Sequence, residues 1–239
     1  MDNPVYATLT RQSGLMREMR TVAQNIANMA TTGYRAENLV FAEYVADTGA
    51  GEPSLSMADA EARWTDKSQG ALFQTGGTFD LAIEGPGFFQ VSTPAGNRLT
   101  RAGSFTPAPD GTLVAPDGAQ LLDSGGAPVF VPPDAHSVAV ASDGTLSADG
   151  TPLAQIGLWQ PADPLTMTRA EGVRFDPGGG GAVPAAEGRV VQGFLERSNV
   201  DPVSEVARMI EVQRAYELGQ TFLDREDERI RATIRANGQ

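Results

Sequence analysis

The chain has no cysteine, one histidine and no long apolar run. Without cysteine it can form neither a disulfide nor a thiolate metal site, and His136 alone cannot complete a zinc site. No stretch approaches the about 18 apolar residues of a membrane-spanning helix. Charged residues such as Arg11, Glu18 and Arg20 interrupt the N-terminal region, where a cleaved secretory signal has an apolar core. We therefore expect no membrane insertion and, for an exported chain, no cleaved signal peptide.

Basic residues are scarce. The chain carries 18 Lys and Arg against 30 Asp and Glu, a formal net charge of -12. Residues 1–36 hold four arginines and two acids, and residues 201–239 hold six arginines and eight acids, so residues 37–200 account for the whole -12. Nucleic acids and anionic membranes need a basic partner surface. We therefore expect no nucleic-acid partner.

Catalytic and metal-binding patterns are also missing. Asp80 and Glu84 could serve a hydrolase as paired carboxylates, but their strand-like surroundings favour two solvated or locally hydrogen-bonded acids. The Asp-Gly pairs lack the spacing of an EF-hand and predict hairpin turns. The glycines at 178–181 precede no Lys-Ser or Lys-Thr, so they predict a loop and no phosphate site, and His136 is predicted to lie in a loop. We therefore expect that the chain is not an enzyme and that it binds neither a metal ion nor a cofactor.

Proline divides the chain into helical ends and a non-helical middle. Of 16 prolines, only Pro4 and Pro202 lie outside residues 53–184, and each opens a helical pattern. The predicted fold is α+β, with an all-β domain inserted between two long terminal helices. We expect an N-terminal helix in residues 1–36, a connector in 37–68, a β domain in 69–195 and a C-terminal helix in 196–239. Within the connector, residues 49–53 are predicted to be flexible and residues 57–62 to have weak helix propensity.

The C-terminal helix is predicted to begin with Asp201 as N-cap and Pro202 at its first position. Its apolar stripe is widened by Val203, Val206 and Ile210. The stripe follows steps of three and four through Met209, Val212, Tyr216, Gly219, Leu223, Glu226 and Ile230. This heptad spacing is typical of a coiled-coil seam. A helix about 50 Å long would need a partner along its length.

The N-terminal helix has a matching pattern. Leu15 and Val22 flank its seam, and Gly33 can supply a left-handed turn after its end. The seam runs through Val5, Leu9, Gln12, Met16, Met19, Ala23 and Ile26. We expect the two terminal helices to pair as a coiled-coil core.

The middle of the chain predicts short strands and hairpins. An alternating strand is expected over Phe79-Asp-Leu-Ala-Ile83 and another strand over Phe88-Phe-Gln-Val91, with Gly85-Pro-Gly87 turning between them. Two copies of one hairpin unit, offset by 33 residues, are marked by the Asp-Gly pairs at 110 and 117 and at 143 and 149. Two copies are too few for a solenoid.

Three blocks of sequence resemble the bacterial flagellar axial proteins, the rod and hook family. The N-terminal block contains Asn25-Ile-Ala-Asn28 and Thr31-Thr-Gly-Tyr-Arg35. The central block contains Gly70-Ala-Leu-Phe-Gln-Thr-Gly76, Phe79-Asp-Leu-Ala-Ile-Glu-Gly85, Gly87-Phe-Phe89, Thr100-Arg-Ala-Gly-Ser-Phe105 and Asp110-Gly-Thr-Leu-Val114. The C-terminal block contains Gly193-Phe-Leu-Glu-Arg-Ser-Asn-Val-Asp-Pro202, Met209-Ile210 and Gln213-Arg-Ala-Tyr216. Together they span the chain, which is most similar to the proximal-rod, F-type subunit.

This resemblance implies a structural subunit of the basal-body rod, located in the periplasm and delivered by the flagellar export apparatus. Its partners would be like and unlike rod subunits, and its terminal helices would line a hollow shaft that transmits torque and passes exported subunits. The assembly interface is predicted at Val5, Leu9, Met16, Met19, Asn25, Ile26, Asn28, Met209, Val212, Tyr216 and Leu223. Gln24-Asn25 and Met29-Ala30 depart from the commoner family pattern and leave the subunit type open. The alternatives are a distal-rod or hook-type axial subunit, a free secreted β module with coiled-coil arms, and an enzyme.

Overall fold

The computed structural model describes residues 3–46 and 55–237, which fall into two compact units. The first unit comprises Met1–Met29, Ala36–Asp66 and Val200–Gln239, and the second comprises Ala30–Arg35 and Lys67–Asn199. The helices are α1 (Asn3–Ala27) and α2 (Pro202–Asn237). The strands are β1 (Glu37–Ala46), β2 (Leu55–Thr65), β3 (Leu72–Gln74), β4 (Leu81–Glu84), β5 (Phe88–Thr93), β6 (Gly96–Thr100), β7 (Thr106–Pro107), β8 (Leu113–Val114), β9 (Gln120–Leu121), β10 (Val138–Val140), β11 (Thr145–Ala148), β12 (Thr151–Gln155), β13 (Leu158–Pro161), β14 (Thr168–Arg169), β15 (Arg174–Asp176), β16 (Ala182–Pro184), β17 (Arg189–Gln192) and β18 (Phe194–Glu196).

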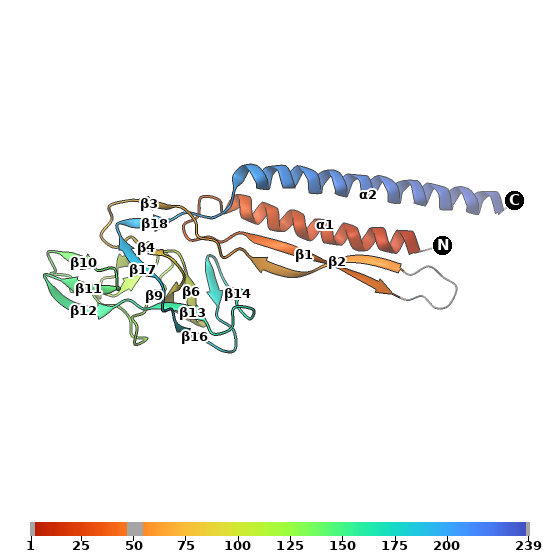
Figure 1. The fold of residues 1–239 in the computed structure, drawn as a ribbon. Helices are drawn as coiled ribbons and strands as arrows, with labels where there is room; N and C mark the ends of the chain where they lie inside the picture. The colour runs from red at the N-terminus through yellow and green to blue at the C-terminus, as the bar shows by residue number, and fades with distance from the viewer. Residues whose placement is uncertain (1–2, 47–54, 238–239) are drawn as a thin grey trace. The chain divides into compact units, whose positions relative to one another are not determined.

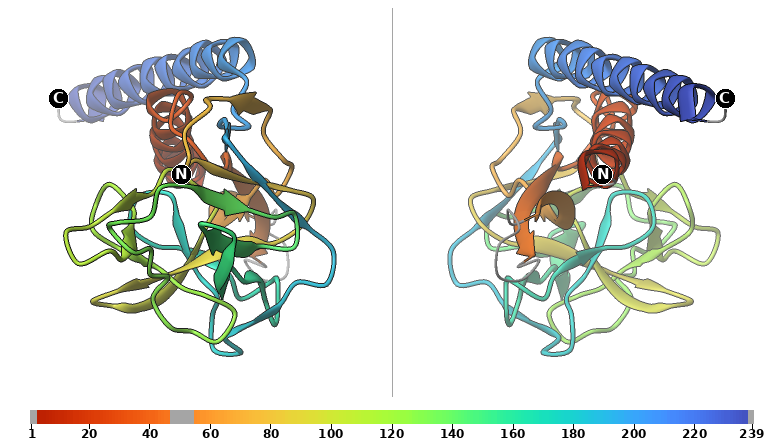
Figure 2. Two further views of the ribbon diagram at one scale, coloured as in Figure 1. Left: turned by 90° about the vertical axis from the view of Figure 1, so that its left-hand side faces the viewer. Right: turned by 90° about the vertical axis from the view of Figure 1, so that its right-hand side faces the viewer.

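In the first unit, α1 lies between α2 and the β1–β2 hairpin (Figures 1 and 2). As predicted, Asp201 caps α2: its carboxylate accepts hydrogen bonds from the backbone N–H of Val203 and Ser204, at 2.9 and 3.4 Å. These bonds and the Ser204 hydroxyl lower the pKa of Asp201. No helix in the described part of the chain is both long and apolar enough to cross a membrane.

The predicted connector contains an antiparallel hairpin. Strand β1 pairs with β2 from Glu37 opposite Thr65 to Ala46 opposite Leu55, with a register shift between Val40 and Phe41. Residues 57–62 therefore lie in a strand, and the helix that their propensity suggested is not formed. Cross-strand pairing with β1 overrides the helix preference of this segment. The predicted flexible tract at 49–53 lies outside the described residues.

The second unit is made of short antiparallel strands. Its largest sheet has the order β14-β15-β6-β5-β9-β8-β7, and β13 pairs with both β5 and β16. Strands β10, β11 and β12 form a separate sheet, and β4 and β3 pair with β17 and β18. The core includes Leu81, Phe89, Leu113, Leu121 and Leu146, each at most 1% exposed.

The predicted hairpin units are confirmed. Turns at the four Asp-Gly pairs connect β7 to β8, β8 to β9, β10 to β11 and β11 to β12. Asp110 and Asp143 occupy matching places, because each accepts a hydrogen bond from the N–H of a threonine two residues later. The strand Phe88–Thr93 is also confirmed. The predicted alternation of buried and exposed residues over 79–83 is wrong, because Leu81, Ala82 and Ile83 are all buried on β4.

Candidate assembly interface

Helix α1 packs through one stripe of side chains. Buried side chains recur along it at steps of three and four, and they are Gln12, Leu15, Glu18, Val22 and Asn25, with the buried Thr21 beside Val22. This spacing keeps them on one side of a helix with 3.6 residues per turn. Both α2 and the β1–β2 hairpin contact α1, so this stripe packs against two neighbouring elements within the first unit.

The seam predicted for α1 lies beside this stripe. Leu9 is 49% exposed, whereas Met16, Met19 and Ile26 are half-buried. The packed face is therefore centred about one residue away from the prediction, on Leu15 and its stripe. The hairpin, which lies in the predicted connector and packs against α1, accounts for the shift. Val5 lies in α1, but its side chain is outside the described part of the structure.

The face of α2 that packs against α1 follows the predicted stripe from Met209 to Leu223, whereas Ile230 and the residues predicted to widen it, Val203, Val206 and Ile210, are exposed. Val212 is 4% exposed, and Met209, Tyr216 and Leu223 are half-buried. Gly219 faces Gln12 of α1 at close range, because a Cβ at this position would lie 2.1 Å from Nε2 of Gln12. That Nε2 donates a hydrogen bond of 2.8 Å to the backbone carbonyl of Tyr216.

Polar groups connect the other end of the helices. Asn25 is 1% exposed; its Nδ2 donates to the carbonyl of Glu37 at 2.8 Å and to Oε1 of Glu205 at 3.2 Å. Its Oδ1 accepts from the N–H of Glu37 at 3.0 Å. Arg208 pairs with Glu18 at 2.8 Å. Asn25, predicted at the assembly interface, thus joins α1, β1 and α2 within one chain.

Asn28, also predicted at the interface, is half-buried just after α1. Its Nδ2 donates to the carbonyl of Gln24 at 2.9 Å, the same carbonyl that accepts the backbone N–H of Asn28 at 3.2 Å.

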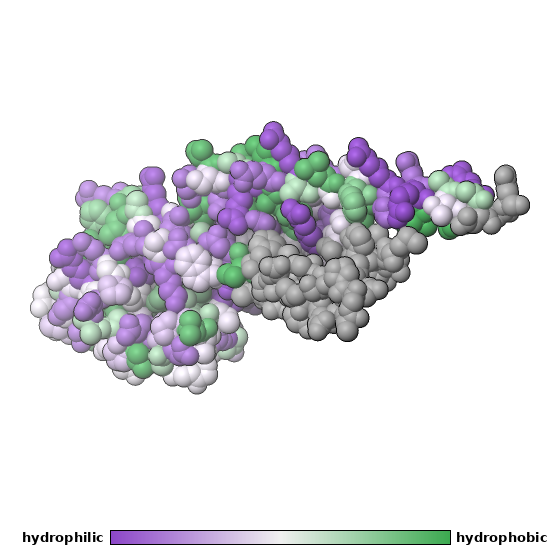
Figure 3. Space-filling view, turned by 45° about the vertical axis from the view of Figure 1, so that its right-hand side comes forward, coloured by the Kyte–Doolittle hydropathy of each residue, from purple (hydrophilic) through white to green (hydrophobic). Residues whose placement is uncertain are grey.

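Several large apolar side chains of α2 reach the surface. Figure 3 shows hydrophobic residues exposed between hydrophilic ones along this helix. They are Val203 (79% exposed), Val206 (48%), Ile210 (46%), Leu218 (72%), Phe222 (43%), Ile230 (42%) and Ile234 (67%). Because Val203 and Leu218 are more than two thirds exposed, α2 has apolar surface that the described residues do not cover.

Helix α2 also extends beyond α1 (Figure 1). It has 36 residues and α1 has 25, a difference of 36 - 25 = 11 residues or about 16 Å. The contacts of Gln12 with Tyr216 and of Asn25 with Glu205 fix an antiparallel register. In that register α1 begins opposite about residue 226, so Ile230 and Ile234 lie on the overhang.

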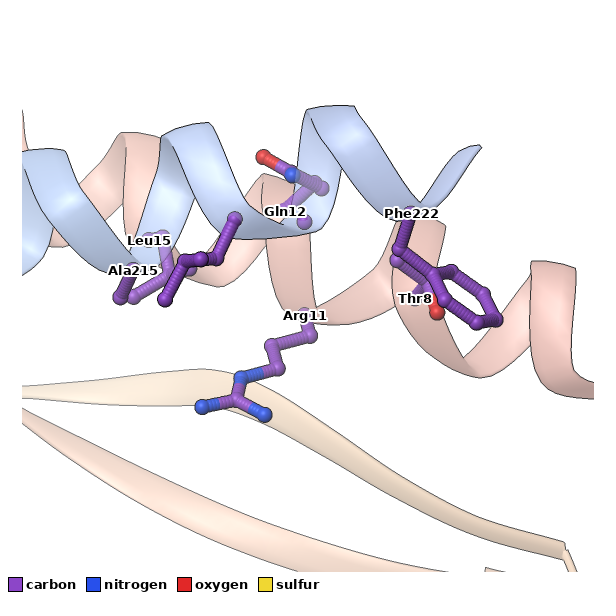
Figure 4. A pocket seen from close by; sticks show the side chains of 8 residues that line it. Thr8, Arg11, Gln12, Leu15, Ala215 and Phe222 are labelled. Atoms are coloured by element: carbon purple, nitrogen blue, oxygen red, sulfur yellow. The ribbon is translucent and has the colours of Figure 1, made fainter. Parts of the chain in front are cut away.

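A groove opens between the two helices (Figure 4). It encloses about 350 Å³. Its lining comes from both helices and consists of Thr8, Arg11, Gln12, Leu15, Ala215, Leu218, Gly219 and Phe222. Arg11 points away from α2, and Oε1 of Gln12 is buried without a hydrogen-bond partner among the described residues. The groove can therefore receive an apolar side chain.

In the second unit, a buried ion cluster joins segments that are distant in sequence. Glu196 is fully buried and contacts Arg35 at 2.6 Å and Arg101 at 3.1 Å. Arg35 follows Gly33, whose φ of +69° confirms the predicted left-handed turn, and the N–H of Gly33 donates to the carbonyl of Glu196 at 2.8 Å. No sequence pattern predicted this cluster, although Arg35 and Glu196 belong to two of the three blocks that resemble the axial proteins.

The residues considered as catalytic, metal-binding or phosphate-binding candidates take part in ion pairs, strand contacts and loops. Glu84 and Arg189 form a bidentate ion pair, in which both contacts are 2.8 Å long. These hydrogen bonds lower the pKa of Glu84. Asp80 forms a β-bridge with Ser104. His136 and the glycines at 178–181 lie in loops, as predicted. Within residues 3–46 and 55–237, no group of three His, Asp or Glu side chains is placed to hold a metal ion.

Comparison with known proteins identifies the family. Residues 82–148 match the flagellar hook protein FlgE/F/G D1 domain, and residues 191–236 match the C-terminal domain of the flagellar basal body rod FlgEFG proteins. The FlgF rod protein of Caulobacter vibrioides is 37% identical, covering 100% of this chain and 99% of its own. FlgF of Mesorhizobium japonicum is 36% identical over 91% of this chain and 90% of its own. FlgG of Bacillus subtilis is 30% identical over 96% and 97%.

These matches run from one end of the chain to the other and include both the β domain and the C-terminal helix. The rod and hook proteins of this family are structural, not enzymatic, and assemble with other axial subunits of the flagellum. The chain therefore belongs to the flagellar basal-body rod family, as a structural protein of the FlgF type.

Proposed function

We propose that this chain is a subunit of the proximal rod and that α1 and α2 join a coiled-coil core shared with neighbouring axial subunits. The supporting observation is the uncovered apolar surface of α2, at Val203, Ile210 and Leu218 and on the overhang. Covering one such side chain contributes about 1.5–3 kcal/mol. A head-to-tail contact that does not close on itself builds a helical shaft.

The exposed Leu9 and two half-buried methionines of α1 complete this surface. Leu9, Met16 and Met19 lie beside the stripe that packs within the chain. Methionine side chains adapt to irregular partners, which suits a subunit that meets several unlike neighbours. In this proposal the interlocked helices transmit torque, and the hollow centre of the shaft passes later subunits outward.

The proposed site of action is the periplasmic part of the basal body. The subunit would arrive through the flagellar export apparatus without a cleaved signal, consistent with the charged residues Arg11, Glu18 and Arg20 on α1. The FlgF relatives are 35–37% identical to this chain and the FlgG relatives 29–31%. This difference favours the proximal F-type subunit over the distal-rod alternative.

The proposal is tested with charges at exposed apolar positions. Val206→Asp and Ile210→Asp each place a carboxylate where burial in an interface would require its desolvation. In a strain with the variant as its sole copy, we expect loss of swimming and no complete rods in purified hook-basal bodies. Circular dichroism of the purified chains should show unchanged helix content, because both side chains are about half exposed, at 48% and 46%.

Gln220→Glu is the matched control. It also adds one negative charge to an exposed position of α2, but it replaces a polar side chain. Rods should form normally with this variant. Normal rods from both aspartate variants would contradict the proposed interface.

A further inference from the structure

A second pocket lies wholly within the β domain and has no part in the helical interface. It encloses about 310 Å³ between the start of β5, the end of β13, β16 and the loop before β14. Phe88, Pro161, Met167 and Val183 contribute apolar surface. This volume is at the small end of ligand sites and matches one or two side chains.

The charge of this pocket is opposite to that of the chain. Its wall includes Lys67 and Arg101 and no acid, although the sequence has 30 acids and 18 basic residues. Lys67 is exposed; its Nζ donates to the carbonyl of Pro164 at 3.0 Å, and no described carboxylate pairs with it. The rim of the pocket therefore presents a cation to solvent.

Arg101 places a second cation at the pocket wall. Its guanidinium carbon lies 5.3 Å from the centre of the Phe88 ring, and its Nε–H has no acceptor among the described residues. Burial lowers the pKa of Arg101 to about 10, although Glu196 opposes this shift and Arg35 adds to it. Additional negative charge nearby would favour the charged form of Arg101.

The backbone around the pocket is constrained. Pro86, Pro161 and Pro164 have fixed φ angles. Gly87 has a φ of +116°, and a Cβ there would lie 3.3 Å from Cβ of Ala185 and 3.4 Å from Cβ of Leu158. A preformed site loses less conformational freedom on binding than a flexible one.

We propose that this pocket binds an acidic peptide segment of a partner protein, with an apolar side chain in the cavity beside Phe88 and Met167 and a carboxylate at the rim facing Lys67. The argument is charge complementarity, because the lining holds Lys67 and Arg101 and no acid, and the buried cluster of Arg101, Arg35 and Glu196 keeps one net positive charge behind the wall. The inference is independent of the helical interface, since every lining residue belongs to the second unit.

The test is a titration of the full-length protein with acetyl-Leu-Glu-amide and with its uncharged analogue acetyl-Leu-Gln-amide. Binding is followed by the NMR shifts of the backbone amides of Gly87, Ala162 and Met167. We expect the glutamate peptide to bind at least about threefold more tightly, with a preference that falls as salt rises from about 0.03 M to about 0.3 M. Lys67→Gln should reduce the preference and Lys67→Arg should retain it.

Val183→Asp adds a negative charge to the wall at a side chain that is 39% exposed, so it should weaken binding of the glutamate peptide without unfolding the domain. Equal binding of the two peptides, or no change in the three amides with either, would overturn the proposal. If 3-phenylpropionate shifts these amides and the glutamate peptide does not, the pocket takes a free acid and the peptide assignment is wrong.

Discussion

Gln12 of α1 occupies the space where residue 219 of α2 has no side chain. A Cβ at Gly219 would lie 2.1 Å from Nε2 of Gln12, the atom that donates to the carbonyl of Tyr216. The position of the Gln12 amide, and with it this hydrogen bond, therefore depends on the absence of a side chain at residue 219.

Gly219→Ala should reveal this dependence in a double-mutant cycle. Alanine favours the helix by about 1 kcal/mol, but it displaces the Gln12 amide and removes a hydrogen bond of about 1 kcal/mol, so the single substitution should change stability little. In a Gln12→Ala background it should stabilise the helical unit by about 1 kcal/mol. Denaturant unfolding followed by helical circular dichroism measures both effects. Equal effects in the two backgrounds would contradict the coupling.

Glu196→Gln should strongly destabilise the β domain. The substitution removes the carboxylate that faces Arg35 and Arg101, and breaking a buried ion pair in this way costs about 3–5 kcal/mol. Tryptophan fluorescence, which includes Trp159 of this domain, can follow the unfolding. Glu84→Gln is the control: it removes an exposed partner of Arg189 and should leave the midpoint of unfolding nearly unchanged. Similar losses for the two variants would argue against a special role of the buried cluster.

Gly33→Ala and Gly76→Ala separate steric conflict from backbone strain. Both glycines have similar φ angles, +69° and +73°. A Cβ at Gly33 would lie 2.2 Å from the backbone nitrogen of Ala102, whereas a Cβ at Gly76 would meet nothing within 4 Å. Gly76→Ala should cost about 1 kcal/mol and Gly33→Ala at least about 2 kcal/mol more. Thermal unfolding compares them, and equal melting temperatures would refute the steric explanation.

Glu205 should make the helical unit more stable as the pH falls. Burial raises the pKa of its carboxyl; the Asn25 hydrogen bond and Arg208 oppose this shift and Asp201 adds to it. A raised pKa means that the folded state binds the proton more tightly than the unfolded state, so the free energy of unfolding decreases as the pH rises through the folded pKa.

The comparison with Glu205→Gln isolates this effect. The stability of the natural chain relative to the variant should increase as the pH is lowered from about 7 to about 5. Denaturant titrations at several pH values measure this difference. A constant difference, or one that grows with pH, would contradict the assignment.

Sequence patterns predicted the elements that depend on local spacing. The packed stripe of α2 and the four Asp-Gly turns follow from periodicity and turn chemistry. The centre of the α1 stripe could not be predicted in this way. It depends on packing against a hairpin, and the second strand of that hairpin contains residues that favour a helix. Likewise, Arg35 and Glu196 are far apart in sequence, and no local pattern indicates that folding pairs them.

The consecutive burial of Leu81, Ala82 and Ile83 shows the same limit. A strand covered on one face alternates between buried and exposed residues, and that was the prediction. Strand β4 pairs with β17, Gly103 packs against the backbone of Leu81, and both Leu81 and Ile83 belong to the core. These neighbours are distant in sequence, so tertiary structure decides the pattern.

The most direct test of the proposed assembly is site-specific photo-crosslinking in purified hook-basal bodies. A photoreactive amino acid replaces Leu218 or Ile234, which are 72% and 67% exposed, and a matched control replaces the buried Leu146 of the β-domain core. The proposed rod core predicts crosslinks from positions 218 and 234 to other axial subunits near the base of the rod, and only intrachain products from position 146. If positions 218 and 234 give only intrachain products in rods that contain the protein, the helices do not form the shared core and the account is wrong.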